Sequence, residues 1–274
     1  MDAIDRFFQE DLDDVGDITS DALLTRETGR AEIWVKQECV LAGLVEATVV
    51  FQRAGATLST EFHDGERVAA GTLVANVVGQ VRDILKAERL ALNFLGRMSG
   101  IATQTKVLCD LVHVVSPKVT VAATRKTTPG FRVYEKKAVV LGGGEAHRMG
   151  LYDAVLIKDN HLRAVGSVET AVTAVQRLHP GMPIEVEVET EEDALVAARL
   201  GVAWIMLDNF EAKTGAVAAK KIRAVNPKVR IEVSGGITKT SIQQYAGFAD
   251  RISVGALTHS VSNIDFSLEL AERP

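Results

Sequence analysis

Residues 183–208, PIEVEVETEEDALVAARLGVAWIMLD, contain the repeating unit from which the fold can be predicted. It opens with alternating apolar and acidic residues, continues with apolar positions at three- and four-residue steps, and closes with a second apolar run. Alternation is typical of a strand and the wider spacing of an amphipathic helix, so the stretch predicts a strand, a helix and a second strand. Such a unit places two parallel strands in one sheet with the helix packed on its face.

The same pattern repeats from about residue 115 to the end of the chain. Together with 183–189 and 203–208, the predicted strands are 118–124, 153–159, 229–236 and 251–256, and the predicted helices are 167–179, 190–201 and 212–225. Each helix has Ser or Thr near its start as a candidate cap. The strand spacing, and the lack of an early GxGxxG turn, favour a (β/α) barrel over an open doubly wound sheet. Six strands predict an incomplete or irregular barrel, although residues 131–146 could hide another strand.

Residues 1–103 have a different pattern, and we expect them to form a mixed α/β domain. DGERVAAGTLVANVVG, residues 64–79, predicts short strands with glycine turns, and residues 82–112 predict one or two long helices. Residues 104–274 would form the barrel, with a last helix at about 264–274 that could return to the N-terminal domain.

The composition narrows the class of protein. A chain of 274 residues that is 47% hydrophobic can bury one barrel-sized core. Cys39 and Cys109 lack the spacing of a disulfide framework or a zinc site and suggest core residues in a reducing compartment. The acidic amino terminus and the absence of an apolar run of roughly 20 residues predict a cytoplasmic protein without a membrane span. The net charge of −5 argues against nucleic acid as a partner.

Polar residues and glycines stand where the predicted barrel strands end. Catalytic groups of parallel barrels gather at this edge, because the carboxyl ends of all strands meet there. One such residue alone would usually be a solvated loop charge, but together they predict an active site. They are Thr124, Arg125, Lys126, Lys158, Glu187, Glu189, Asp208, Ser234, Gly235, Gly236, Gly255 and Ala256.

Three glutamates share one face of the predicted strand at 183–189. The apolar residues between them suit a layer of helices, so we predict that Glu185, Glu187 and Glu189 point into the barrel. Buried carboxylates need cations, and Lys158 and Arg125 are candidate partners. For Glu185, the deepest of the three, a purely structural ion pair is an equally open interpretation.

Five cationic or titratable residues gather between positions 124 and 161, namely Arg125, Lys126, His147, Arg148 and Lys158. Guanidinium groups bind carboxylates or phosphates through paired hydrogen bonds, and lysine supplies a compact charge. This segment therefore predicts a site for a small substrate with several negative charges. The glycines after the last two strands would offer backbone N–H groups to a phosphate.

These motifs resemble the quinolinate phosphoribosyltransferase family, also called carboxylating nicotinate-nucleotide pyrophosphorylase. The resemblance covers nearly the whole chain. It rests on EDLDDVGDITSDALL at 10–24, AERLALNFLGRMSGIAT at 87–103, TRKTTPG at 124–130, GGGEAHRMGLYDAVLIKDNH at 142–161, EVEVE at 185–189, MLDN at 206–209 and VSGGI at 233–237.

The resemblance implies a type II phosphoribosyltransferase fold, in which an N-terminal mixed domain packs on an incomplete α/β barrel. It also implies a cytoplasmic pentosyltransferase of NAD biosynthesis. This enzyme would transfer phosphoribosyl from phosphoribosyl pyrophosphate, with Mg²⁺, to quinolinate and would release nicotinate mononucleotide, pyrophosphate and CO₂. The partners would be the two substrates and a second copy of the chain, in a homodimer or higher oligomer with shared active sites.

The resemblance also assigns roles to residues of this sequence. Quinolinate and neighbouring phosphates would contact Arg89, Thr124, Arg125, Lys126, His147, Arg148 and Lys158. Arg89 would be donated by the partner subunit. Glu187 and Asp208 would bind the ribose and pyrophosphate end, with magnesium held through the pyrophosphate, and the 5′-phosphate would meet Ser234, Gly235, Gly236, Gly255 and Ala256. The residues assigned to the chemical step are Lys126, Lys158, Glu187 and Asp208.

Other functions stay open on the sequence alone. A paralogue of molybdate-transport operons with a different substrate shares the fold, but Lys158 favours quinolinate. Nicotinate or nicotinamide phosphoribosyltransferases are longer chains. A Schiff-base aldolase would use Lys158 as its nucleophile. A barrel that has lost catalysis and only binds a metabolite as a regulator is disfavoured, because the charged residues of the site are all present. His147 could be a substrate ligand or a structural hydrogen-bonding residue.

Overall fold

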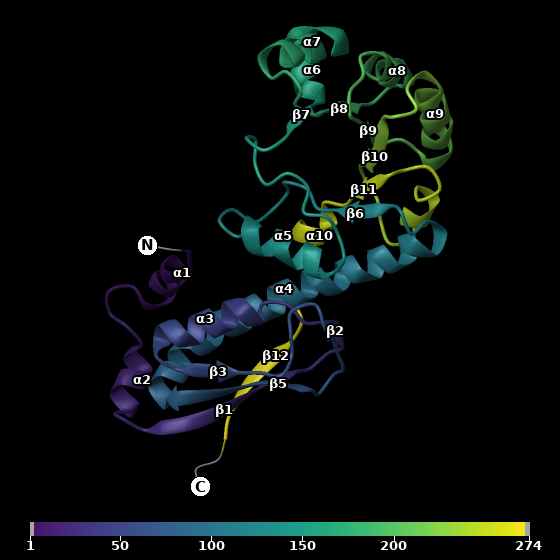
Figure 1. The fold of residues 1–274 in the computed structure, drawn as a ribbon. Helices are drawn as coiled ribbons and strands as arrows, with labels where there is room; N and C mark the ends of the chain where they lie inside the picture. The colour runs from purple at the N-terminus through teal and green to yellow at the C-terminus, as the bar shows by residue number, and fades with distance from the viewer. Residues whose placement is uncertain (1–2, 272–274) are drawn as a thin grey trace. The chain divides into compact units, whose positions relative to one another are not determined.

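The computed structural model describes residues 3–271 and divides the chain into two compact units (Figure 1). The first unit contains the chain up to Lys106, residues 128–142 and the chain from Ser260 onward. The second contains residues 107–127 and 143–259. Three separate segments of the chain thus form the first unit, whereas the sequence predicted a single domain boundary at residue 103.

A six-stranded parallel sheet forms the centre of the second unit. Its strand order is β6-β11-β10-β9-β8-β7, and every neighbouring pair is parallel. The strands are β6 Thr120–Ala122, β7 Val155–Ile157, β8 Ile184–Val188, β9 Trp204–Asp208, β10 Arg230–Ser234 and β11 Arg251–Ser253. All six predicted strands are confirmed.

The barrel is incomplete, as predicted, because β6 and β7 remain the edges of the sheet. The additional strand considered for residues 131–146 was wrong. Residues Arg132–Leu141 form helix α5, and only a single parallel bridge joins Glu145 to Ala122. The apolar positions of this segment recur at helical spacing, and helix α5 belongs to the first unit.

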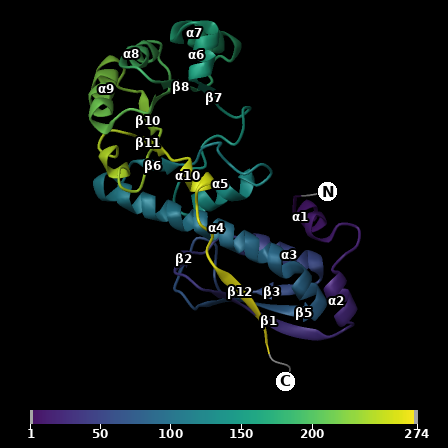
Figure 2. The ribbon, with the colours of Figure 1, turned by 180° about the vertical axis from the view of Figure 1, so that it is seen from behind.

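Helices lie along the outer side of the parallel sheet (Figure 2). They are α6 Asp159–Val165, α7 Val168–Leu178, α8 Glu191–Arg199 and α9 Ala212–Val225, followed by the 3-10 turn Ile242–Gln244 and α10 Ala256–His259. Ser167 and Thr190 cap α7 and α8 by accepting hydrogen bonds from backbone N–H groups, as predicted. The predicted Ser/Thr cap of α9 was wrong, because Glu211 stands at that position without a side-chain hydrogen bond to the helix.

The first unit contains an antiparallel sheet of order β12-β1-β5-β3 and a small sheet of β2 and β4. Its strands are β1 Thr28–Val35, β2 Cys39–Val40, β3 Thr57–Ser59, β4 Arg67–Val68, β5 Leu73–Gln80 and β12 Phe266–Leu270. Its helices are α1 Ala3–Leu12, α2 Ile18–Leu23, α3 Leu44–Ala54 and α5, together with the first part of α4 Val81–Val115, which continues into the second unit.

The predicted last helix, at about 264–274, was wrong over the described residues. Phe266–Leu270 form strand β12, which pairs with β1 from Ala31↔Leu270 to Val35↔Phe266. Apolar and polar residues alternate in FSLEL, and pairing with β1 satisfies the backbone of the segment. Among the described residues, no helix is both long and apolar enough to cross a membrane. Cys39 and Cys109 are buried and are not joined in a disulfide, as predicted.

Candidate active site at the carboxyl ends of the parallel strands

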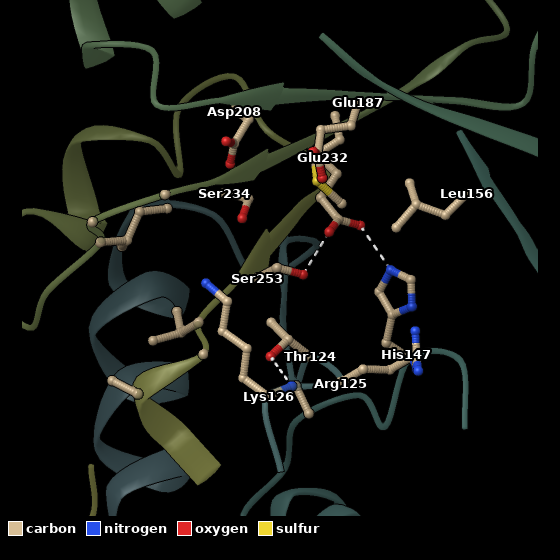
Figure 3. Close-up of a pocket in the computed structure, with 18 of the residues that line it drawn as sticks. Thr124, Arg125, Lys126, His147, Leu156, Glu187, Asp208, Glu232, Ser234 and Ser253 are labelled. Atoms are coloured by element: carbon tan, nitrogen blue, oxygen red, sulfur yellow. Dashed lines mark hydrogen bonds and ion pairs between the residues drawn. The ribbon is translucent and has the colours of Figure 1, made fainter. Parts of the chain in front are cut away.

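A cavity of about 720 Å³ opens at the carboxyl ends of the parallel strands (Figure 3). Every residue that lines it belongs to the second unit. The predicted residues on its wall are Thr124, Arg125, Lys126, His147, Arg148, Lys158, Glu187, Asp208, Ser234, Gly235, Gly236, Gly255 and Ala256. The fold therefore brings together residues that are more than 130 positions apart in the sequence.

All five residues of the predicted anion site reach this cavity. Arg125 Nε is buried and has no hydrogen-bond partner among the described residues. Burial and the nearby charge of Arg125 lower the pKa of Arg148. Because a buried Nε–H group without a partner is costly next to a second guanidinium group, this part of the wall is suited to an incoming anion.

The segment after β6 holds Lys126 at the cavity wall. The Lys126 N–H donates to Thr124 Oγ1 at 3.1 Å, and the fully buried Thr258 donates its hydroxyl to the Lys126 carbonyl oxygen at 2.7 Å. The backbone of Lys126 is thus fixed from two sides. Figure 3 shows the amino group extending toward the part of the cavity where Ser234 and Asp208 lie.

Two carboxylates stand on neighbouring strands at the same edge. Glu187 is buried on β8 and accepts a hydrogen bond from Lys158 Nζ at 2.7 Å, so one of its two predicted partners is confirmed. Asp208 ends β9 and accepts from Asn209 Nδ2 at 2.7 Å. Glu189 was predicted to point inward, but it lies beyond the end of β8 and is exposed. Its strand ends one residue earlier than the sequence pattern indicated.

The turn after β10 requires glycine. Gly235 has φ +95°, and a Cβ atom on it would lie 2.2 Å from Asn209 Oδ1 and 2.8 Å from Asn209 N. Any larger side chain would meet both a strained backbone conformation and the neighbouring turn. The backbone from Ser234 to Gly236 is therefore open to the cavity, as a phosphate-binding turn needs.

His147 lies at the inner wall between two buried glutamates. Its Nε2 atom is 3.3 Å from a carboxylate oxygen of Glu185 and 3.3 Å from one of Glu232. Burial by itself disfavours the charged ring, but the hydrogen bonds to both glutamates and their charges raise the pKa of His147 to about 9. The Arg148 N–H points at Nδ1 at 2.7 Å, so protonation of Nδ1 requires this N–H to turn away.

The two glutamates titrate in opposite directions. Burial raises the pKa of Glu185. Burial also opposes ionisation of Glu232, yet the hydrogen bond from His147, the charges of His147 and Arg251 and the hydrogen bond from Ser253 lower its pKa. The three ligand atoms of His147, Glu185 and Glu232 lie within 4.8 Å of one another, a spacing compatible with a metal ion. Arg251 and Ser253 already provide Glu232 with hydrogen-bond donors, which suits an ion-pair network better.

Comparison with known proteins places the chain in a family. The family profile described as quinolinate phosphoribosyl transferase, C-terminal domain, matches residues 101–269, and the profile of its N-terminal domain matches residues 17–99. The chain belongs to the quinolinate phosphoribosyl transferase family. The type II phosphoribosyltransferase-like fold expected from the resemblance is thereby confirmed.

Proteins from several organisms align with most of this chain. A probable nicotinate-nucleotide pyrophosphorylase (carboxylating) of Archaeoglobus fulgidus is 43% identical over 260 residues, which are 94% of this chain and 99% of the relative. The nicotinate-nucleotide pyrophosphorylase (carboxylating) of Rattus norvegicus is 38% identical and covers 88% of this chain and 81% of the relative. The crystal structure of NadC from Streptococcus pyogenes superposes with a TM-score of 0.91 at 38% identity over 98% of this chain and 95% of that one.

Arg89 is a predicted site residue that is not among those lining this cavity. Arg89 is exposed on α4 in the first unit and does not line the cavity, so its proposed role depends on a second copy of the chain. Sequence reasoning also missed several lining residues, among them Glu232, Ser253 and His259. Glu232 lies in the strand sequence RIEVS, where one acidic residue between apolar neighbours was the available signal.

Proposed function

We propose that this protein transfers the phosphoribosyl group of phosphoribosyl pyrophosphate to the ring nitrogen of quinolinate and releases CO₂, pyrophosphate and nicotinate mononucleotide. The observation that carries the proposal is one cavity in which a cluster of cations, two carboxylates and a glycine turn stand side by side. Family membership and the names of the relatives support the same reaction.

Quinolinate carries two carboxylates, and the cationic side of the cavity suits them. The buried Nε of Arg125 has no hydrogen-bond partner among the described residues. Burial and the nearby charge of Arg125 lower the pKa of Arg148. Paired guanidinium groups bind carboxylates with defined geometry. Together with Lys158 and His147, and with Arg89 from a partner subunit, they would fix the pyridine ring with its nitrogen toward the ribose.

Phosphoribosyl pyrophosphate would occupy the other side of the cavity. Its 5′-phosphate would accept hydrogen bonds from the turn at Ser234, Gly235 and Gly236 and from Gly255 and Ala256. Lys126 extends toward this side and would neutralise phosphate charge. In this arrangement the anomeric carbon would lie between the glycine turn and the pyridine nitrogen.

Carboxylates near the ribose serve the transition state. When pyrophosphate leaves, positive charge develops on the sugar, and the buried Glu187 and the nearby Asp208 would stabilise it. The same oxygen ligands are those that Mg²⁺ prefers, so Glu187 and Asp208 would hold it together with the pyrophosphate, where it neutralises the charge of the leaving group. Lys158 orients the Glu187 carboxylate through its 2.7 Å hydrogen bond.

Decarboxylation after transfer makes few further demands on the protein. The C–CO₂ bond breaks, its electron pair stays on carbon 2 of the ring, and the adjacent quaternary nitrogen stabilises that pair until a proton arrives. No general base is needed for this step. The Schiff-base alternative is disfavoured, because Lys158 Nζ is ion-paired with Glu187 and not desolvated in an apolar pocket.

The test is a direct assay of the reaction. Purified protein with quinolinate, phosphoribosyl pyrophosphate and Mg²⁺ should form nicotinate mononucleotide and CO₂ in equal amounts. Product from nicotinate but not from quinolinate would overturn the dicarboxylate assignment. If neither quinolinate nor nicotinate gave product, the molybdate-operon paralogue would be favoured. A borohydride-trapped adduct with a phosphorylated aldehyde would favour the aldolase.

A further inference from the structure

Glu232 is a buried carboxylate on the cavity wall to which the proposed reaction gives no task. It lies on β10 and has no exposed surface. Burying a carboxylate costs several kcal/mol unless cations and hydrogen-bond donors compensate for the lost water. The groups that compensate for the burial of Glu232 therefore indicate the role of its carboxylate.

Three donors from two other parts of the second unit surround Glu232. Arg251 Nη1 donates to Glu232 at 2.9 Å and Ser253 Oγ donates at 2.5 Å, both from β11, and His147 Nε2 lies 3.3 Å from the carboxylate, from the segment before β7. His147 and Ser253 line the cavity, whereas Arg251 does not. Figure 3 shows Glu232 between the hydroxyl of Ser253 and the ring of His147. Glu232 thus joins a structural ion pair to two side chains of the cavity wall.

The ring of His147 depends on this contact. His147 has φ +52°, a left-handed conformation that few non-glycine residues adopt, and the following residue is Arg148. Nε2 faces Glu232 and Glu185, and Nδ1 faces the Arg148 N–H. The contacts of Nε2 with the two buried carboxylates fix the ring and stabilise the strained turn that places Arg148 in the cavity.

We infer that Glu232 is a positioning residue for the anion site, which acts through His147 and the turn that carries Arg148. The inference rests on the proposed function, because it assigns the ordered His147–Arg148 pair to the binding of quinolinate. Loss of the Glu232 charge should therefore weaken quinolinate binding and leave phosphoribosyl pyrophosphate, on the other side of the cavity, largely unaffected.

The experiment compares Glu232→Gln with a matched control, Glu145→Gln. Glu145 is the other carboxylate paired with Arg251, at 2.7 Å, but it does not line the cavity. For Glu232→Gln, KM for quinolinate and its calorimetric Kd should rise by about 10- to 100-fold, the usual cost of a hydrogen bond to a charged group, while KM for phosphoribosyl pyrophosphate changes by less than about threefold. Glu145→Gln should keep both constants. Equal changes in both KM values, or an unchanged quinolinate Kd, would overturn the inference.

A double-mutant cycle tests whether the effect passes through His147. In a His147→Ala background, Glu232→Gln should weaken quinolinate binding by less than about twofold further, because the residue through which it acts is gone. Independent, multiplicative losses would contradict the inference. An inactive wild type that also fails to bind quinolinate would instead refute the proposed function.

A measurement on the wild type covers the case in which Glu232→Gln does not fold. With ¹⁵N-labelled histidine, the Nε2–H of His147 should give a slowly exchanging, downfield proton signal that His147→Gln removes. A rapidly exchanging Nε2 proton would contradict a ring fixed by buried carboxylates. Metal analysis of the purified protein should find no ion at this site, and one equivalent of metal lost in His147→Gln would make Glu232 a ligand and overturn the positioning role.

Discussion

The two ends of the parallel sheet contain similar residue types but use them differently. At the amino ends of the strands, Arg230 and Arg251 stack over the ring of Trp204 at 4.1 and 3.8 Å, and Arg251 pairs with two glutamates. At the carboxyl ends, Arg125, Lys126 and Arg148 face a cavity of about 720 Å³. Charges at the first end are neutralised within the protein, whereas the three cationic side chains at the second end line a cavity that a ligand can enter. A mutation should therefore cost stability at one end and activity at the other.

The largest effect is expected from Arg125→Ala at the carboxyl end. Loss of paired, charge-assisted hydrogen bonds to a substrate carboxylate should lower kcat/KM for quinolinate by about 100- to 1000-fold. The melting temperature should stay within about 2 °C, because Arg125 Nε has no partner in the protein to lose. Steady-state kinetics and thermal unfolding measure the two quantities. A destabilised but fully active variant would contradict the assignment of the carboxyl ends to activity.

Arg89→Ala extends the comparison to a second copy of the chain. Like Arg125→Ala, it should be nearly inactive alone, yet mixing the two variants should restore about a quarter of wild-type activity. Half of randomly mixed dimers are heterodimers, and each of these has one intact site. The control is each variant mixed with itself. No recovery after subunit exchange is verified would argue against a shared site.

A smaller effect is expected from Gly235→Ala in the turn after β10. The added Cβ would contact Asn209 at 2.2 Å and force a strained conformation at φ +95°. KM for phosphoribosyl pyrophosphate should rise by about tenfold, while the quinolinate Kd changes little, because the distortion is confined to the phosphate side. Gly247→Ala is the matched control, since nothing lies within 4 Å of its added Cβ. A reversed pattern would place the phosphate elsewhere.

Trp204→Leu tests the opposite end of the sheet. Loss of the buried ring and of both stacked guanidinium groups should lower the free energy of unfolding by about 2–4 kcal/mol. Both KM values of the folded enzyme should stay within about twofold of wild type. Urea denaturation and kinetics at low temperature would measure this, and a selective rise of one KM would show that the two ends are coupled.

The smallest expected effect is a pH dependence of stability from His147. Its pKa is raised to about 9 in the folded state, above the ordinary histidine value, so its contribution is complete below about pH 6.5 and is lost as the pH rises through 9. The free energy of unfolding should fall by about 2 kcal/mol between pH 7 and 9, relative to His147→Gln. Parallel curves for the two proteins would mean that the ring is not stabilised in its charged form.

Much of the fold was predictable because its signals are local. Strands β6 to β11 and helices α7 to α9 follow from apolar periodicity, and the caps at Ser167 and Thr190 from residue type alone. The segment FSLEL was misassigned because pairing with β1, more than 230 residues away, decides its conformation. Residues 131–146 were ambiguous because a short apolar run fits a strand as well as a helix.

The site shows the same division. The sequence was enough to predict the cationic residues of the site, because both the charge of a residue and its position relative to a predicted strand can be read from the sequence. These residues are Arg125, Lys126, His147, Arg148 and Lys158. Glu189 was misplaced by one residue, since its strand stops at Val188. Glu232 was missed because its importance comes from partners 85 and 19–21 positions away.

Local patterns in the sequence were enough to predict strands β6 to β11, helices α7 to α9, the residue types at the strand ends and the family. Only the tertiary structure decided that the sheet stays open between β6 and β7, that the last strand joins β1, and which buried charges neutralise one another. Periodicity and residue type depend on neighbours along the chain. Pairing of charges and strands depends on distances in space, which are set only when the whole unit packs together.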